Sequence, residues 1–146
     1  MEIRKIQQND LLICSKLLES AYSLPPHNET FKDNAAELYI NGKYIYCKDN
    51  SFVMVNEENN VIAFIFLNIS SWSQGLQAVL EEIVVDSNYQ NKGVGKELLD
   101  YVNNYLKSLG VKSIMLWAKR DERLLDFYKK QGYSLADDYV VMFKNL

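Results

Sequence analysis

Cysteine, proline and histidine are scarce in this 146-residue chain. The two cysteines, Cys14 and Cys47, lie far apart, form no CxxC pair and have no histidine close by in the sequence. This is not the spacing of a disulfide framework or a zinc site, so we expect reduced, buried thiols of a cytoplasmic protein, and no metal. The only prolines, Pro25 and Pro26, are adjacent and predict a break after the first helix.

Basic clusters and long apolar runs are also missing. The formal net charge is −3, which argues against a general nucleic-acid-binding protein. The longest apolar run, residues 61–67, is too short to cross a bilayer, and the first residues lack the apolar core of a signal peptide. We therefore expect neither a nucleic acid nor a membrane as a partner.

The remaining composition is that of an ordinary globular protein, with 48% hydrophobic and 24% charged residues. The length suits one domain over residues 1–146, and no repeat, low-complexity tract or linker divides it.

Hydrophobic periodicity predicts a mixed α/β order of elements. We expect helices at 11–20, 29–40, 93–108 and 122–131. Asn9 or Asp10 should cap the first helix, and the second should end at Asn41–Gly42. Residues 44–47 are either a loop or a short helix. Strands are expected at 2–6, 52–55, 61–69, 76–85 and 112–118, with a last hairpin of 133–135 and 139–143. The sheet should be antiparallel first and then parallel across a right-handed crossover.

The turn between the strand at 76–85 and the next helix is the most informative stretch. It consists of Gln90, Asn91, Lys92, Gly93, Val94, Gly95 and Lys96. A strand, a glycine turn and a helix N-terminus in that order offer free backbone N–H groups and partial positive charge, which suit a diphosphate. The alternative is a helix start that merely contains glycine.

Two nucleotide-binding patterns do not match this turn, because residues with defined roles in those patterns are replaced. A dinucleotide-binding GxGxxG would need glycine where Leu98 stands, and no acidic residue ends the next strand. A P-loop would need a hydroxyl residue after Lys96, where Glu97 stands, and a glycine in place of Gln90. The pattern Q/R-x-x-G-x-G/A matches fully.

With this loop, the chain resembles the GCN5-related N-acetyltransferase (GNAT) superfamily over most of its length. The resemblance rests on LEEIVVD at 80–86, YQNKGVGKELL at 89–99 and LDFYKKQGY at 125–133, in this order and spacing. It implies a mixed sheet splayed between the fourth and fifth strands, with helices on both faces. It also implies acetyl-CoA as the acetyl donor and an amine as the acceptor.

The resemblance also implies a cofactor site. Backbone N–H groups of residues 90–96 would hold the CoA pyrophosphate, and main-chain groups of Ile83 and Val85 would pair with the pantetheine arm. A main-chain N–H near Val84 or Val85 would stabilise the oxyanion. Asp121 stands where many members have Asn; it can cap the next helix, while its pantetheine contact is open.

Tyr128, in the FYxxxGY match, would protonate the leaving thiolate. A phenol of pKa about 10 is reasonably matched to a thiol of pKa about 8.5. The alternative is that Tyr128 only packs its helix against the sheet.

Glu81 and Glu82 are the candidates for the general base. Both lie in an apolar strand, where desolvation beside a second carboxylate raises a glutamate pKa. Strand alternation predicts that Glu81 faces the same side as Ile83 and Val85, so we favour Glu81, with Glu82 second. Polyamine acetyltransferases of the superfamily carry an acidic pair at this place. A strand carboxylate without a catalytic part is the alternative.

His27, Glu29 and Trp72 are candidate substrate contacts that, with the two glutamates, would form an acidic, aromatic mouth for a cation. The leading hypothesis is acetyl transfer to a small primary amine, such as a polyamine, an aminoglycoside-like sugar amine or an amino-acid derivative. Acetylation of a protein N-terminus or lysine is the second, and an acyl-CoA-binding sensor without turnover is a third. The resemblance also implies a possible homodimer, because members of this family often form dimers.

Overall fold

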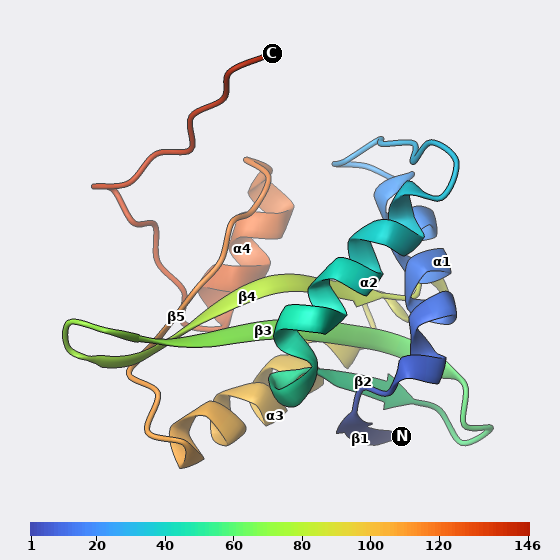
Figure 1. Cartoon of the computed structure of the whole chain (residues 1–146), viewed down its shortest axis with the longest axis horizontal. Helices are drawn as coiled ribbons and strands as arrows, with labels where there is room; N and C mark the ends of the chain where they lie inside the picture. Colours follow the sequence, from blue (N-terminus) through green and yellow to red (C-terminus); the bar gives the residue numbers. More distant parts are fainter.

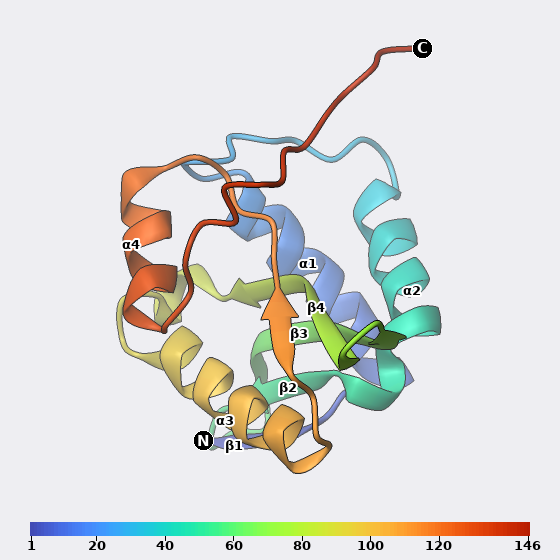
Figure 2. The same cartoon turned by 90° about the vertical axis from the view of Figure 1, so that its left-hand side faces the viewer.

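The computed structural model describes all 146 residues and shows a single twisted sheet with helices on both faces (Figures 1 and 2). The strands are β1 (Glu2–Lys5), β2 (Phe52–Val55), β3 (Val61–Trp72), β4 (Gly75–Val85) and β5 (Ser113–Met115). The α-helices are α1 (Leu11–Tyr22), α2 (Ala35–Cys47), α3 (Val94–Ser108) and α4 (Glu122–Lys130). Short 3-10 turns, η1 (Gln8–Asp10), η2 (Lys48–Asn50) and η3 (Ser87–Tyr89), connect some of them.

The sheet has the mixed topology that the sequence predicts. Its order is β1-β2-β3-β4-β5, antiparallel except for the parallel β4–β5 pair. Apolar side chains of β2 and β3 alternate between two cores. One core packs against α1 and α2, and its members include Cys14, Leu18, Ile40, Val53 and Phe64. The other packs against α3 and α4, and its members include Phe52, Ile65, Leu98, Val102 and Tyr128.

The sheet opens between β4 and β5, which confirms the expected splay. β5 pairs only with residues 77–79 of β4, whereas β3 pairs with β4 as far as Val85. The backbone N–H of Asp86 donates to Ile62 of β3 at 2.8 Å. Because backbone groups of successive strand residues point to opposite edges, those of Ile83 and Val85 face the open side. This half of β4 therefore has a free edge.

A β-bulge interrupts β4 at Glu81. Phe66 pairs with Glu82 and Leu67 pairs with Leu80, so Glu81 has no partner on β3. The bulge breaks the strict alternation of faces. The prediction that Glu81 shares a face with Ile83 and Val85 is therefore wrong: its carboxylate contacts Lys43 of α2, on the opposite side of the sheet.

The second helix begins later and ends later than predicted. α2 runs through Gly42 to Cys47, so the helix does not end at Asn41–Gly42, and residues 44–47 are helical. A glycine inside a helix costs only about 1 kcal/mol. Burial of Ala36, Ile40 and Cys47 along one face of the helix offsets that cost.

The predicted cap of the first helix is also absent. Asp10 makes no capping hydrogen bond to α1; it accepts from both guanidinium nitrogens of Arg4 at 2.8 and 2.9 Å and from the N–H of Gln7 at 2.8 Å. Asp10 thereby joins β1 to the start of α1.

The predicted C-terminal hairpin is absent, and β5 is shorter than expected. Residues 131–146 form no strand, and residues 140–146 lead away from the body of the molecule (Figures 1 and 2). Short hairpin loops need a residue with positive φ, and the last such residue in the chain is Gly132.

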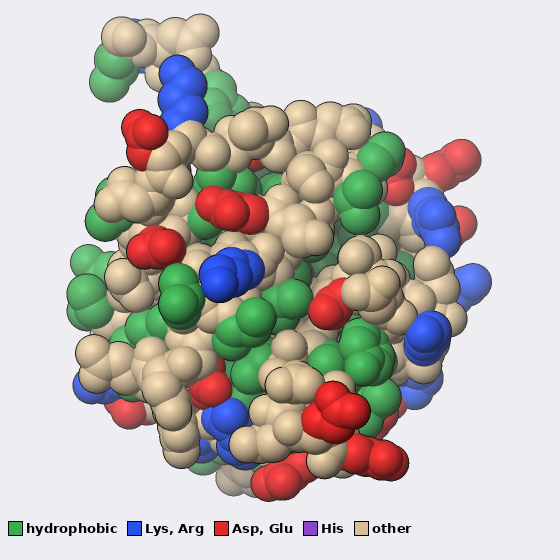
Figure 3. All heavy atoms as spheres, turned by 90° about the vertical axis from the view of Figure 1, so that its right-hand side faces the viewer, with side chains coloured by type: hydrophobic (Ala, Val, Ile, Leu, Met, Phe, Trp, Pro, Cys, Tyr) green, Lys and Arg blue, Asp and Glu red, His purple; other side chains and the backbone are tan.

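The surface seen in Figure 3 carries acidic and basic side chains interspersed with apolar ones, and no basic stripe crosses this face. None of the helices has the length and apolar character needed to span a membrane.

Candidate functional site

The loop after β4 presents unpaired backbone donors. Asn91 and Gly93 have positive φ (58° and 82°), and α3 begins directly after Gly93. The first helical hydrogen bond runs from the N–H of Glu97 to the carbonyl of Gly93, at 2.9 Å. The N–H groups of residues 93–96 make no hydrogen bond within the chain. Together with the helix dipole they can bind an anion such as a diphosphate.

Contacts to β4 and α4 fix this loop. The Gln90 side chain donates to the carbonyl of Val85 at 3.1 Å, and Arg123 of α4 donates to the side chain of Asn91 at 3.0 Å. A Cβ on Gly95 would lie 3.3 Å from the ring of Phe127, so glycine allows α3 to pack closely on α4. The loop is therefore held between the open edge of β4 and the helix that carries Tyr128.

Glu82 lies beside the splay, between β4 and the two N-terminal helices. Its carboxylate accepts hydrogen bonds from Tyr22 of α1, at 2.9 and 3.0 Å, and from Tyr39 of α2, at 3.0 Å. Burial raises the pKa of Glu82, and the two tyrosine hydrogen bonds offset only part of that rise. Burial, followed by the charge of Glu82, raises the pKa of both tyrosines, so they stay protonated donors.

Glu81 has a different partner. Its carboxylate forms an ion pair with Lys43 at 2.8 Å, and the Lys43 ammonium also lies 5.4 Å from the ring centre of Tyr39. A cation pairs directly with Glu81, whereas the side-chain donors to Glu82 are the hydroxyl groups of Tyr22 and Tyr39. The adjacent glutamates therefore have different partners, a cation for Glu81 and two phenols for Glu82.

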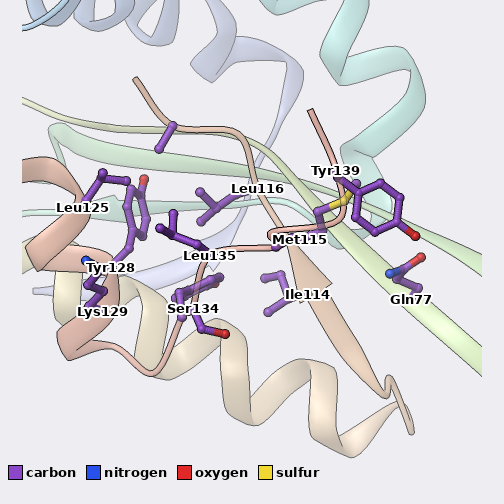
Figure 4. A pocket seen from close by; sticks show the side chains of 13 residues that line it. Gln77, Ile114, Met115, Leu116, Leu125, Tyr128, Lys129, Ser134, Leu135 and Tyr139 are labelled. Atoms are coloured by element: carbon purple, nitrogen blue, oxygen red, sulfur yellow. The ribbon is translucent and has the colours of Figure 1, made fainter. Parts of the chain in front are cut away.

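Tyr128 is buried on α4, with 9% of its surface exposed, and packs edge-on against Phe127 and Tyr133. Burial, and then the negative charge of Glu82, raises the pKa of Tyr128. Its hydroxyl makes no hydrogen bond within the chain. Tyr128 also lines a cavity of about 320 Å³ between α4, β5 and residues 133–136 (Figure 4).

An aromatic group continues from Tyr22 into the loop between α1 and α2. His27 stacks on the Tyr22 ring at 4.1 Å between centroids, and Phe31 meets that ring edge-on at 6.0 Å. Burial, and then the charge of Lys119, lowers the pKa of His27, which favours the neutral imidazole. Glu29 is exposed, but its N–H donates to the carbonyl of Tyr22 at 2.8 Å.

The other predicted residues lie elsewhere. Trp72 pairs with Gly75 at the tip of the β3–β4 hairpin, is 74% exposed, and does not join the group around Glu82. Asp121 caps α4 by accepting from the N–H of Leu124 at 2.9 Å. Asp121 thus has the capping role expected of it.

Sequence reasoning missed Tyr22, Tyr39 and Lys43, which surround the two glutamates. They lie on α1 and α2, far from β4 in sequence, and only the packing of these helices on the sheet brings them together. No local pattern marks them, because a tyrosine or lysine on a helix is common.

Comparisons with known proteins agree with this geometry. Residues 14–133 match the model of the acetyltransferase (GNAT) family. The chain is 37% identical over 60 residues to an uncharacterized ycf52-like N-acetyltransferase of Prochlorococcus marinus, a match spanning 41% of this chain and 32% of that relative. It is 23% identical to the [ribosomal protein bS18]-alanine N-acetyltransferase of Escherichia coli K12, over 92% of this chain and 81% of that protein. The crystal structure of a possible acetyltransferase from Clostridium difficile 630 superposes with a TM-score of 0.84 at 15% identity, covering 99% of this chain and 97% of the other.

Proposed function

The chain belongs to the acetyltransferase (GNAT) family and is an N-acetyltransferase, and on this premise we propose that it acetylates the primary amine of a small cationic molecule, with Glu82 as the general base. The observation that carries the proposal is the buried Glu82 carboxylate, hydrogen-bonded to Tyr22 and Tyr39 next to the opening of the sheet. Glu82 thus replaces our first preference, Glu81.

The free edge of β4 and the loop after it suit acetyl-CoA, which supplies the thioester when bound. The unpaired N–H groups of residues 93–96 would hold its diphosphate, and the absence of a Cβ at Gly95 keeps the start of α3 close to α4. Backbone groups of Ile83 and the N–H of Val85 would pair with the extended pantetheine arm as a strand would. The carbonyl of Val85 already accepts from Gln90, so it has less capacity for this pairing.

Glu82 would receive the proton of the amine. An alkylammonium is protonated at neutral pH and must lose a proton before its nitrogen can attack. A carboxylate with a raised pKa is better matched to this task than an ordinary surface glutamate. Tyr22 and Tyr39 hold the carboxylate in place and, because they stay protonated, do not compete for the proton.

Tyr128 would hold the proton that the leaving sulfur needs. The raised pKa keeps its hydroxyl protonated, and no hydrogen bond within the chain restrains that hydroxyl. Glu82 and Tyr128 are close enough that the charge of one affects the pKa of the other. A proton acceptor and a proton donor thus come from two elements, β4 and α4, on either side of the splay.

The surroundings of Glu82 support a cationic acceptor. Tyr22, His27 and Phe31 form an aromatic group beside a buried negative charge, an arrangement that attracts ammonium ions. The bS18-alanine relative supports a second candidate, acetylation of a protein N-terminus, which requires the same proton chemistry. A sensor that binds acyl-CoA without turnover is the remaining alternative from a different class.

A thiol-release assay tests the proposal. Acetyl-CoA is offered as the donor, and the acceptors compared are polyamines, aminoglycosides, amino-acid amides and peptides with free N-termini. We expect the fastest release with a small polycationic amine and little release with peptides. A peptide as the best acceptor would favour the second candidate, and acetyl-CoA binding without any release would favour the sensor. Failure to bind acetyl-CoA in isothermal titration would contradict the assignment of the loop.

A further inference from the structure

Lys43 of α2 holds its ammonium group in surroundings that suit an ammonium ion. The Lys43 Nζ lies 2.8 Å from a carboxylate oxygen of Glu81 and 5.4 Å from the ring centre of Tyr39. Carboxylates and aromatic ring faces both attract ammonium ions. The chain thus fills one ammonium site with a side chain of its own.

Tyr39 connects this site to the proposed base. Its hydroxyl donates to the Glu82 carboxylate at 3.0 Å, while its ring lies near the Lys43 ammonium. The two adjacent carboxylates therefore contact the same helix, α2, on one side of the sheet. Without Lys43, they would offer sites for two ammonium groups of a single acceptor molecule.

Solvent reaches the ion pair. The side chains of Lys43 and Glu81 are 27% and 21% exposed, so the pair lies at the wall of the site and not in the core. A second ammonium group that approached Glu81 would meet the charge of Lys43. Like charges brought together in partly buried surroundings repel each other strongly.

The α1 side of Glu82 offers a different environment. Tyr22 donates to the Glu82 carboxylate, and the His27 ring stacks on the Tyr22 ring. The N–H of Glu29, an exposed residue, donates to the carbonyl of Tyr22 at 2.8 Å. Further ammonium groups of a long acceptor can therefore lie along an aromatic wall beside an exposed acidic residue.

We propose that Lys43 is a specificity-determining residue, because its ammonium occupies the Glu81 carboxylate and denies that site to a second amino group of the acceptor. This inference rests on the proposed function, in which Glu82 takes the proton of the reacting amine. Distal charges of a longer polyamine would extend toward Tyr22 and Glu29. Short diamines, whose two charges lie close together, should therefore gain little over monoamines of the same length.

Lys43→Met tests this proposal, because it removes the charge and keeps a side chain of similar length. Thiol release with acetyl-CoA gives kcat/KM for propane-, butane- and pentanediamine and for the monoamine with the same chain. We expect the ratio of diamine to monoamine to rise at least about tenfold in Lys43→Met for one or more of these pairs. A merely structural role of Lys43 would lower kcat/KM for both amines and leave their ratio unchanged.

Three further variants serve as controls. Lys43→Arg keeps the charge and should keep the wild-type ratio. Lys48→Met removes an exposed lysine directly after α2 and should also keep it. Lys43→Met combined with Glu81→Gln should return to the wild-type ratio, because Glu81 is the group expected to bind the second ammonium. Circular dichroism checks folding, and Lys43→Gln gives the same comparison with a polar side chain.

The outcomes separate this inference from the proposed function. If wild type acetylates these amines and neither Lys43→Met nor Lys43→Gln changes the ratio, the inference is overturned and the proposed function stands. A rise that persists in the double variant would overturn the inference too, since Glu81 would not be the site. If wild type acetylates no amine of any acceptor class, the proposed function fails and this inference fails with it.

Discussion

At the scale of single residues, the contrast between Glu81 and Glu82 decides the proposed chemistry. The two side chains are adjacent in sequence, yet one is paired with an ammonium group and the other is held by two phenols. An ammonium group occupies the Glu81 carboxylate, whereas burial raises the pKa of Glu82. The β-bulge produces this contrast, because it turns both side chains toward α2.

Changing Tyr128 to Phe removes the proposed proton donor without changing the packing of the ring. We expect kcat to fall by about 10²-fold or more, since general acid catalysis contributes on that order, while acetyl-CoA affinity stays within about twofold. A thiol-release assay measures kcat, and isothermal titration measures the affinity for acetyl-CoA. Tyr133→Phe is the matched control, because that ring packs against Tyr128 and lies in the same cavity. Equal losses of kcat in Tyr128→Phe and Tyr133→Phe would indicate that Tyr128 only packs its helix against the sheet.

The local structure of the loop and of the helix that carries Tyr128 could be predicted from the sequence, because each depends on a short local pattern. Gln90 to Lys96 and the FYxxxGY match lie in continuous stretches whose elements form as expected. The side of the sheet that Glu81 faces could not be predicted correctly. It depends on a bulge opposite Phe66 and Leu67 and on helices packed from elsewhere in the chain.

At the scale of elements, both ends of α3 should affect the stability of the chain, whereas only its N-terminal end should affect acetyl-CoA binding. Gly93 and Gly110 flank α3, with φ of 82° and 77°. Valine at either position is strained, at a cost of about 1–2 kcal/mol, because its Cβ crowds the backbone at positive φ. We expect Gly93→Val and Gly110→Val to lower the unfolding free energy similarly in urea titrations.

Only Gly93→Val should also weaken acetyl-CoA binding, by at least about tenfold, because only that end of α3 presents the free N–H groups. Isothermal titration measures this difference. Equal affinities for the two variants would show that the diphosphate lies elsewhere.

Elements with one continuous apolar face could be predicted from the sequence. Elements that depend on contacts with residues distant in the sequence could not. α3 follows its apolar stripe from Val94 to Leu106, and α4 begins at its Asp121 cap. α2 continues through Gly42 to Cys47, whose side chain is buried in the core shared with β2 and β3, and local propensity does not report this burial. Residues 139–143 have the composition of a strand, but no backbone hydrogen bond joins them to a strand of the sheet.

At the scale of the whole molecule, acid stability should depend on the Arg4–Asp10 pair. Burial alone would raise the pKa of Asp10, but the hydrogen bonds from Arg4 and Gln7 outweigh it and lower the pKa. The stabilisation from Asp10 is therefore fully present above its unfolded pKa of about 3.9 and is lost as pH falls through the lower folded value.

Asp10→Asn should lower the unfolding free energy by about 2 kcal/mol at neutral pH, with a smaller loss as the medium is acidified. Asp137→Asn, in the exposed turn near the C-terminus, is the matched control and should cost little stability at any pH. Urea titrations between pH 3 and 7 measure both variants. A constant difference between Asp10→Asn and wild type over this range would contradict the assigned role of Asp10.

The overall fold was predictable because the order of elements and the glycine turn agree on one topology. The sheet order and the parallel β4–β5 pair follow from strands joined by hairpins and then by a helix. The acceptor could not be predicted, because the loop between α1 and α2 that we propose as part of its site has no regular pattern over residues 25–34.

We propose that Glu82, and not Glu81, accepts the proton of the amine. The most direct measurement is kcat/KM as a function of pH for wild type, Glu82→Gln and Glu81→Gln, with the best amine of the acceptor panel. Because burial raises the pKa of Glu82, activity in wild type should fall on acidification with a pKa above the ordinary glutamate value of about 4.3. Glu82→Gln should lose about 10²- to 10⁴-fold in kcat/KM and this acidic limb, while Glu81→Gln keeps both within a few-fold. The reverse result, with Glu81→Gln inactive and Glu82→Gln retaining the wild-type profile, would contradict the claim.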